Sequence, residues 1–121
     1  MTCRVVLCDD ARDYVKLLKL LIDMESDMEV IGAAYDGEEA IKMCTELQPD
    51  LLVLDVSMPV MDGLTALPRI REVSPATNIV MLSGFSSDVV KQQALDLGAR
   101  AFIEKGVSPL VLPGQLREQF P

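Results

Sequence analysis

The chain has 121 residues, half of them hydrophobic and a quarter charged, which suffices for one domain with its own core and leaves no room for a second catalytic domain. Its 19 acidic residues outnumber its 11 basic ones, so the formal net charge of −8 repels phosphate backbones and anionic lipid. The absence of histidine excludes Ser/His/Asp hydrolysis and histidine-based zinc sites. We therefore expect a single domain over residues 1–121 that binds neither nucleic acid nor a membrane directly.

The cysteines and the N-terminal segment indicate where the protein works. Cys3, Cys8 and Cys44 are odd in number, lack CxxC spacing and sit in apolar surroundings, which predicts buried free thiols in a reducing compartment. The N-terminal segment MTCRVVLCDD reaches two aspartates before a signal-type apolar stretch can form. No apolar run approaches the roughly 18 residues of a membrane span. We expect a cytoplasmic protein.

Short apolar runs alternate with amphipathic stretches along the whole chain, which predicts an α/β domain. In chain order the pattern predicts strands and helices in turn, strand first, at residues 4–8, 11–25, 28–34, 38–47, 51–54, 64–72, 78–82, 87–97, 101–103 and 108–120. The first helix would bury a face made of Tyr14, Leu17, Leu18, Leu21 and Ile22. The fourth helix would carry Val89, Val90, Leu95 and Leu97 on its apolar side. The run Leu51–Leu54 is apolar on both alternating faces, as in a central parallel strand.

Proline and glycine mark the ends and interruptions of the predicted helices. Pro68 should kink or shorten the helix at 64–72. Gly98 follows the next helix as a C-terminal cap residue. Ser108 and Pro109 begin the last stretch as a cap and a first helical residue, but Pro113-Gly114 interrupts it. The final helix is therefore expected to be broken or to start late.

Right-handed crossovers between such strands give a doubly wound, five-stranded parallel sheet, in which ligands bind beyond the carboxyl ends of the strands. The polar residues that follow the predicted strands are Asp9, Asp10, Asp55, Ser83 and Lys105. Singly, each is explained as a helix cap, a turn residue or a solvated lysine. Jointly they are not, because independent turn residues have no reason to gather at one end of four strands.

Three carboxylates in one crevice would repel one another and raise each other's pKa, so the arrangement calls for a divalent cation and a lysine. Mg²⁺ fits best, because it takes oxygen ligands and is commonly completed by a phosphate oxygen. Ser83 and Lys105 would then donate hydrogen bonds to that phosphate. The sequence thus predicts a Mg²⁺-dependent phosphate site formed by Asp9, Asp10 and Asp55.

Several short motifs lie at or near these strand ends: Asp9-Asp10, Asp55-Val56-Ser57-Met58-Pro59, Asp62-Gly63, Ser83-Gly84, Gly98-Ala99, and Phe102 three residues before Lys105. With this set the chain resembles the receiver domain of two-component response regulators over essentially its whole length. The resemblance implies a flavodoxin-like sheet of strand order 2-1-3-4-5, which is the strand order of a known receiver domain.

The resemblance also implies roles for individual residues. Asp55 would accept a phosphoryl group from a phosphohistidine on a histidine kinase or a histidine phosphotransfer protein. Asp10 and Asp55 would ligate Mg²⁺ directly, Asp9 directly or through water, and the backbone carbonyl of Ser57 would complete the protein ligands. Lys105 would offset charge on the transferred group. The chain would catalyse its own phosphorylation and dephosphorylation, with no separate small-molecule substrate.

A switch and its output are implied as well. The Ser83 hydroxyl would turn to the bound phosphoryl group, letting Phe102 swing inward and changing the face of the fourth helix, fifth strand and fifth helix. That face would control an output domain or an effector protein. Phe102 lacks the hydroxyl of the tyrosine often found there, so an ordinary core phenylalanine is the alternative. Phe85, by its apolar bulk, is expected to slow hydrolysis of the phosphoryl group.

The chain departs from the family pattern at two further places. Gly106 follows Lys105 where the family usually has proline, so a cis peptide is not expected there, since it costs about 2.5 to 4 kcal/mol. Pro113-Gly114 breaks the helix that commonly forms a dimer surface, so a homodimer need not have the family geometry. The segment Met28–Ala40 (MEVIGAAYDGEEA) resembles receivers fused to helix-turn-helix output domains.

Two other functions remain as alternatives. An aspartyl-nucleophile phosphatase or phosphotransferase usually has a second aspartate two residues after the nucleophile, where this chain has Ser57. A receiver-like interaction module that is never phosphorylated is opposed by the complete polar set. Flavin binding lacks support, because no glycine- and hydroxyl-rich loop follows the first strand.

Overall fold

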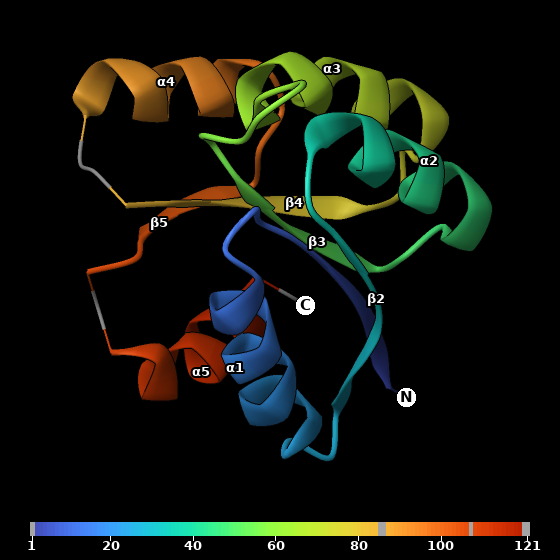
Figure 1. The fold of residues 1–121 in the computed structure, drawn as a ribbon, viewed down its shortest axis with the longest axis vertical. Helices are drawn as coiled ribbons and strands as arrows, with labels where there is room; N and C mark the ends of the chain where they lie inside the picture. Colours follow the sequence, from blue (N-terminus) through green and yellow to red (C-terminus); the bar gives the residue numbers. More distant parts are fainter. Residues whose placement is uncertain (1, 85–86, 107, 120–121) are drawn as a thin grey trace.

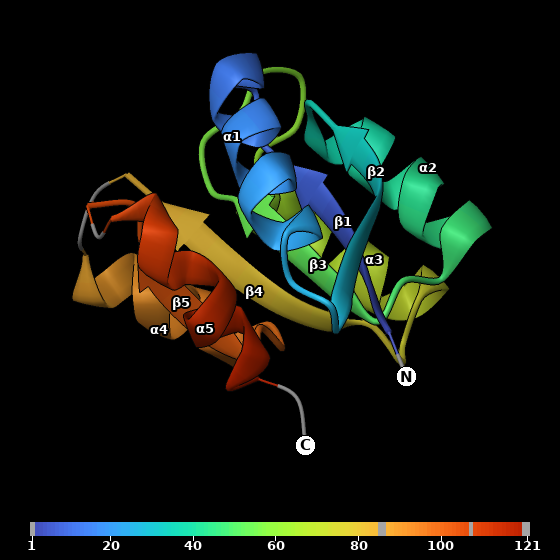
Figure 2. The ribbon, with the colours of Figure 1, turned by 90° about the horizontal axis from the view of Figure 1, so that it is seen from below.

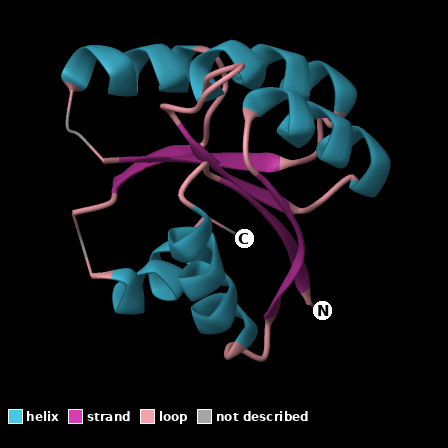
Figure 3. Cartoon of the chain, viewed as in Figure 1, coloured by secondary structure: helices cyan, strands magenta, loops and turns pink. Residues whose placement is uncertain are grey.

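The computed structural model describes residues 2–84, 87–106 and 108–119. Its centre is a five-stranded parallel sheet of order β2-β1-β3-β4-β5, which confirms the predicted doubly wound, flavodoxin-like fold (Figures 1 and 3). In chain order the elements are β1 (Cys3–Cys8), α1 (Arg12–Asp23), β2 (Met28–Ala34), α2 (Gly37–Leu47), β3 (Leu51–Asp55), α3 (Gly63–Val73), β4 (Asn78–Ser83), α4 (Asp88–Asp96), β5 (Ala101–Glu104), a 3₁₀ turn (Pro109–Val111) and α5 (Leu112–Arg117).

The helices cover the sheet on both faces: α2, α3 and α4 lie on one face, and α1 and α5 on the other (Figures 1 and 2). Successive strand residues point to opposite faces, so each strand contributes to two cores. The core under α2–α4 takes from the strands Val6, Cys8, Leu52, Leu54, Ile79 and Met81. The core under α1 and α5 takes Val5, Leu7, Leu51, Val53, Val80 and Leu82. All five residues of β3 are buried, as expected for the central strand.

The prediction that Pro68 shortens its helix is wrong. The structure has α3 over Gly63–Val73, slightly longer than predicted, with Pro68 inside it and exposed. Proline in a helix interior costs about 3 kcal/mol. Ala66, Leu67 and Ile70 are fully buried from the same helix, and burying a single large aliphatic side chain is worth about 1.5 to 3 kcal/mol, so their packing outweighs the proline cost.

Two predicted helix faces need correction. On α1 the buried residues are Val15, Leu18 and Ile22, whereas Leu17 is 41% exposed. The apolar residues of α1 extend around the helix beyond the part that faces the sheet, so hydrophobicity alone did not locate the buried stripe. On α4 only Ala94 is buried and Val89 is 69% exposed, because this helix covers the edge of the sheet with few contacts.

The end of the chain starts its helix late, as predicted, but Pro113-Gly114 does not break it. A 3₁₀ turn capped by Ser108 precedes α5, and Pro113 falls in the first turn of α5, where a missing N–H costs nothing. Gly98 follows α4 with a φ of 107°, which confirms it as the cap residue.

The three cysteines are free thiols, as predicted. Cys8 and Cys44 are buried, but Cys3 is only half-buried, because it begins β1 at the rim of the sheet. Within the described residues, no helix is long and apolar enough to span a membrane.

Candidate functional site

The sheet brings all five predicted polar residues to the carboxyl ends of its strands. Asp9 and Asp10 follow β1, Asp55 ends β3, Ser83 ends β4 and Lys105 follows β5. The parallel register aligns these ends, since Cys8 pairs with Leu54, Asp55 with Leu82, and Ser83 with Glu104. The backbone N–H of Lys105 donates to the carbonyl oxygen of Ser83 at 2.7 Å, which fixes where the lysine leaves the sheet.

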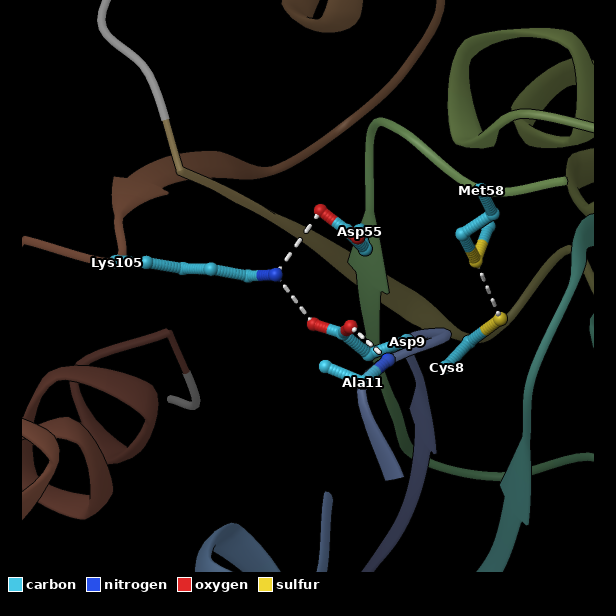
Figure 4. Close-up of polar contacts among 6 residues, drawn as sticks. All are labelled: Cys8, Asp9, Ala11, Asp55, Met58 and Lys105. Carbon is cyan, nitrogen blue, oxygen red and sulfur yellow. Dashed lines mark hydrogen bonds and ion pairs between the residues drawn. The ribbon is translucent and has the colours of Figure 1, made fainter. Parts of the chain in front are cut away.

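The lysine side chain joins two of the carboxylates. Lys105 Nζ lies 2.5 Å from Asp9 Oδ2 and 3.3 Å from Asp55 Oδ1, reaching both from the β5 side (Figure 4). Asp9 and Asp55 are 4% and 5% exposed, while Asp10 is exposed. The other oxygen of Asp9 accepts a hydrogen bond from the backbone N–H of Ala11 at 2.9 Å, which orients that carboxylate.

The three aspartates fit a bound cation. One carboxylate oxygen from each of Asp9, Asp10 and Asp55 lies within 4.8 Å of the other two. Apart from its ion pair with Lys105, the buried oxygen Asp9 Oδ2 has no hydrogen-bond partner among the described residues. An all-oxygen set with one solvent-facing carboxylate suits Mg²⁺, which keeps several waters and takes few protein ligands.

The electrostatics of the site agree with this fit. Burial, and next the charge of Asp9, raise the pKa of Asp55 to about 6, although Lys105 opposes the shift. Burial lowers the pKa of Lys105, but the hydrogen bond with Asp9 and the charges of Asp55 and Asp9 together raise it above its ordinary value. One ammonium thus faces three carboxylates, so the site carries excess negative charge that a divalent cation would neutralise.

The remaining predicted residues lie around this cluster. Ser57 is exposed in the loop after β3, and Ser83 is buried at the end of β4. Phe102 is half-buried in β5, pairs with Met81 in the sheet and packs against the core under α2–α4. The peptide after Lys105 is not cis, as expected, and no cis peptide occurs in the described ranges. Phe85 lies outside the described residues.

The loop between β3 and α3 is held by contacts that the sequence did not reveal. The Gly63 N–H donates to the Val56 carbonyl at 2.8 Å, closing the loop directly behind Asp55. Cys8 Sγ lies 3.4 Å from Met58 Sδ, on the side of Asp55 away from Lys105 (Figure 4). Gly63 was predicted only as a turn residue, and Cys8 only as a buried thiol. Their spacing from Asp10 and Asp55 carries no signal of these contacts.

Tyr14 is a further residue whose contact at the site was not predicted. Its ring centroid lies 5.1 Å from Lys105 Nζ. The helical periodicity placed Tyr14 on the apolar face of α1, where it does contact the core under α1 and α5. The available signal was its position one helical turn after Asp10, which brings its side chain to the same end of the sheet.

Comparisons with known proteins agree with this geometry. A protein-glutamate methylesterase/protein-glutamine glutaminase from Caldanaerobacter subterraneus subsp. tengcongensis is 44% identical over 104 residues, which cover 84% of this chain and 28% of that protein. This chain therefore spans less than a third of that relative's length. The relative is named for methylesterase and glutaminase activity, so it adds no support for the resemblance of Met28–Ala40 to receivers fused to helix-turn-helix domains.

Solved structures give the same answer. The response regulator domain of Thermotoga maritima CheB superposes with a TM-score of 0.88 at 32% identity, covering 98% of this chain and 94% of that one. A chain of the CheX-CheY-BeF3-Mg+2 complex from Borrelia burgdorferi superposes with a TM-score of 0.91 at 29% identity, covering 98% and 90%. The family model described as the response regulator receiver domain matches residues 5–117. Because that match spans nearly the whole chain, the protein belongs to the response regulator receiver domain family.

Proposed function

We propose that this receiver domain accepts a phosphoryl group on Asp55 from a phosphohistidine of a histidine kinase or a histidine phosphotransfer protein. The observation that carries the proposal is the contact of the buried Asp55 carboxylate with Lys105, in a cluster with Asp9 and Asp10. Membership of the receiver family supports it. A buried carboxylate beside both a fixed cation and an acidic cluster has the parts that phosphoryl transfer needs.

In the transfer, an oxygen of the Asp55 carboxylate forms a bond to phosphorus while the bond from phosphorus to the donor imidazole nitrogen breaks. The electron pair of the broken bond stays on that nitrogen, and the product is an acyl phosphate. Asp55 must be ionised to attack, and a pKa of about 6 leaves it ionised at neutral pH. The Lys105 ammonium is placed to stabilise charge on the phosphoryl oxygens.

Asp9, Asp10 and Asp55, with the backbone carbonyl of Ser57, would hold Mg²⁺. The bound ion would supply positive charge at the phosphoryl oxygens. Asp9 keeps its orientation through the backbone N–H of Ala11, so it can face the ion without rearranging α1. Asp10, the exposed member, leaves one side of the site open to the donor.

The phosphoryl group would be sensed by Ser83 and transmitted through Phe102 to the face of α4, β5 and α5, which would control an output domain or effector. Two observations support this route. The carbonyl oxygen of Ser83 accepts a hydrogen bond from the backbone N–H of Lys105, so the two residues lie together at the end of the sheet where the phosphoryl group would bind. Ala94 is the only buried residue of α4, so little burial opposes a shift of that helix.

Incubation with acetyl phosphate and Mg²⁺, followed by intact mass measurement, tests the proposal. Wild type should gain one phosphoryl group that hydroxylamine removes, as expected for an acyl phosphate. Asp55→Asn and EDTA-treated wild type should gain none, whereas Asp96→Asn, an exposed carboxylate on α4, should label like wild type. No gain in wild type would favour the alternative of an interaction module that is not phosphorylated.

A further inference from the structure

The Lys105 ammonium has three partners in the described residues, and one of them carries no charge. Its Nζ contacts Asp9 at 2.5 Å and Asp55 at 3.3 Å, and lies 5.1 Å from the centroid of the Tyr14 ring. We propose that Tyr14 is a positioning residue that holds the Lys105 ammonium over the acidic cluster during phosphoryl transfer. This inference rests on the proposed function of Asp55.

The ring is well placed for this role. Tyr14 lies in the first turn of α1, is half-buried and packs against the core under α1 and α5. These contacts hold the ring in place independently of Lys105. A cation within about 6 Å of an aromatic centroid is attracted by the ring quadrupole. The Lys105 side chain is only 21% exposed, so water screens this attraction incompletely.

The uncharged partner, Tyr14, is important because both charged partners of Lys105 also take part in the proposed reaction. Asp9 and Asp55 are the residues proposed to hold the cation and to accept the phosphoryl group. When Mg²⁺ and the phosphoryl group are bound, these ligands neutralise part of the negative charge of the two carboxylates. Their hold on Lys105 then weakens. Tyr14 has no charge for a metal or a phosphoryl group to engage, so its contact with Lys105 persists through the reaction.

The chain contains a matched control pair. Arg12, also in the first turn of α1, lies 3.8 Å from the centroid of the half-buried Tyr35 ring just after β2. In the described parts of the chain, Arg12 makes no ion pair with Asp9, Asp10 or Asp55. Replacing Tyr35 therefore removes a comparable ring and cation contact at the same end of the sheet without touching Lys105.

The rate of phosphorylation by acetyl phosphate distinguishes the variants. Tyr14→Phe keeps the ring and should react like wild type, as should Tyr35→Leu. Tyr14→Leu should react about two- to fivefold more slowly, the rate equivalent of one cation–π contact at a partly exposed site. If Tyr14→Leu does not fold, Tyr14→Met, which is longer and equally apolar, replaces it.

A spectroscopic measurement separates positioning from simple packing. In wild type and Tyr14→Phe, the ε-methylene protons of Lys105, assigned by their loss in Lys105→Arg, should be shifted upfield by the ring, with and without Mg²⁺. The shift should vanish in Tyr14→Leu. Equal reaction rates in wild type and Tyr14→Leu, or an unshifted Lys105 signal in wild type, would overturn the role of Tyr14 alone. No phosphoryl gain in wild type would overturn the proposed function, and this role with it.

Discussion

Gly63 lies directly against the main chain of Asp55. A β-carbon added to Gly63 would stand 2.0 Å from the Asp55 carbonyl oxygen and 3.0 Å from its carbonyl carbon. These atoms are backbone, so no side chain can move to make room. The start of α3 is therefore packed onto the end of β3, and the residue that would carry the phosphoryl group is held by a contact that only glycine permits.

The first prediction is that Gly63→Ala is destabilising and slows phosphorylation. Because the added methyl group must displace the main chain of Asp55, we expect the free energy of unfolding to fall by about 1 to 3 kcal/mol, as for overpacking of a core. Urea denaturation checks the stability, and the acetyl phosphate reaction checks the site.

The control for this substitution is Gly114→Ala in α5, where an added β-carbon meets nothing within 4 Å. Alanine favours a helix over glycine, so this variant should be more stable than wild type by about 0.5 to 1 kcal/mol. Equal stability changes in the two variants would contradict the special constraint at Gly63.

The second prediction concerns Val60, in the loop between β3 and α3. Its φ of 67° lies in the left-handed region, which is costly for a β-branched residue by about 1 to 2 kcal/mol, and its side chain is 76% exposed, so it contributes little packing. Val60→Gly should relieve this strain and, after the entropic cost of glycine, raise the unfolding free energy by about 0.5 to 1 kcal/mol. Val89→Gly, at a similarly exposed valine in α4, should bring no such gain when both are compared by urea denaturation.

The sequence predicted the strands and the polar cluster well because both follow from short-range patterns. Each predicted run of three to seven residues became a strand, and the residues that end those strands meet at one edge by the geometry of any parallel sheet. The failures have a different origin. Pro68 stays helical because tertiary burial outweighs a local preference, and Leu17 is exposed because the apolar residues of α1 are more numerous than its buried stripe.

Contacts at the site that involve ordinary residues were not predictable. The Tyr14 ring lies beside Lys105, a residue 91 positions away in chain order. Its place one turn after Asp10 indicates the end of the sheet that it reaches, but not its partner there. The same holds for Cys8 with Met58, whose sulfur atoms meet only because β1 and the loop after β3 converge. Such pairs depend on how the elements pack, and the periodic pattern of apolar residues in the sequence does not indicate them.

The third prediction concerns the ion pair that ties the last turn of α5 to the segment before β2. Arg117 contacts both oxygens of Asp27, at 2.7 and 2.9 Å, and this hydrogen bonding lowers the pKa of Asp27 below its ordinary 3.8. A lowered pKa means that the stabilisation is present above pH 3.8 and is lost as the pH falls through the folded-state pKa. Asp27→Asn should therefore be less stable than wild type at pH 7 and equal to it in strong acid.

Salt provides the check on this pair, because both side chains are exposed. In about 1 M NaCl, where the Debye length is about 3 Å, the difference between wild type and Asp27→Asn at pH 7 should shrink. Urea denaturation at two pH values and two salt concentrations measures it. A difference that is independent of pH would contradict an electrostatic origin.

The fourth prediction uses the opposite shift at Asp55, whose pKa rises from 3.8 to about 6 because of burial and the charge of Asp9. The folded state then binds the proton of Asp55 more tightly than the unfolded state does, so the contribution of Asp55 to stability is largest below about pH 4 and is lost as the pH rises through about 6. Asp55→Asn keeps the shape without the charge. In metal-free buffer at pH 7.5 it should be more stable than wild type by about 1 to 3 kcal/mol, and the two should converge below pH 4.

Added Mg²⁺ should stabilise wild type more than Asp55→Asn, because the Asp55 charge that destabilises the metal-free protein is the charge that would bind the cation. Any ligand that binds only the folded state stabilises it in proportion to the logarithm of one plus the ratio of its concentration to Kd. The melting temperature of wild type should therefore rise with Mg²⁺ more than that of Asp55→Asn, which retains only Asp9 and Asp10 as carboxylate ligands. Equal rises in melting temperature in both proteins would mean that Asp55 takes no part in binding the metal. If Asp55→Asn is less stable than wild type at pH 7.5 without metal, then Lys105 already compensates the charge of Asp55.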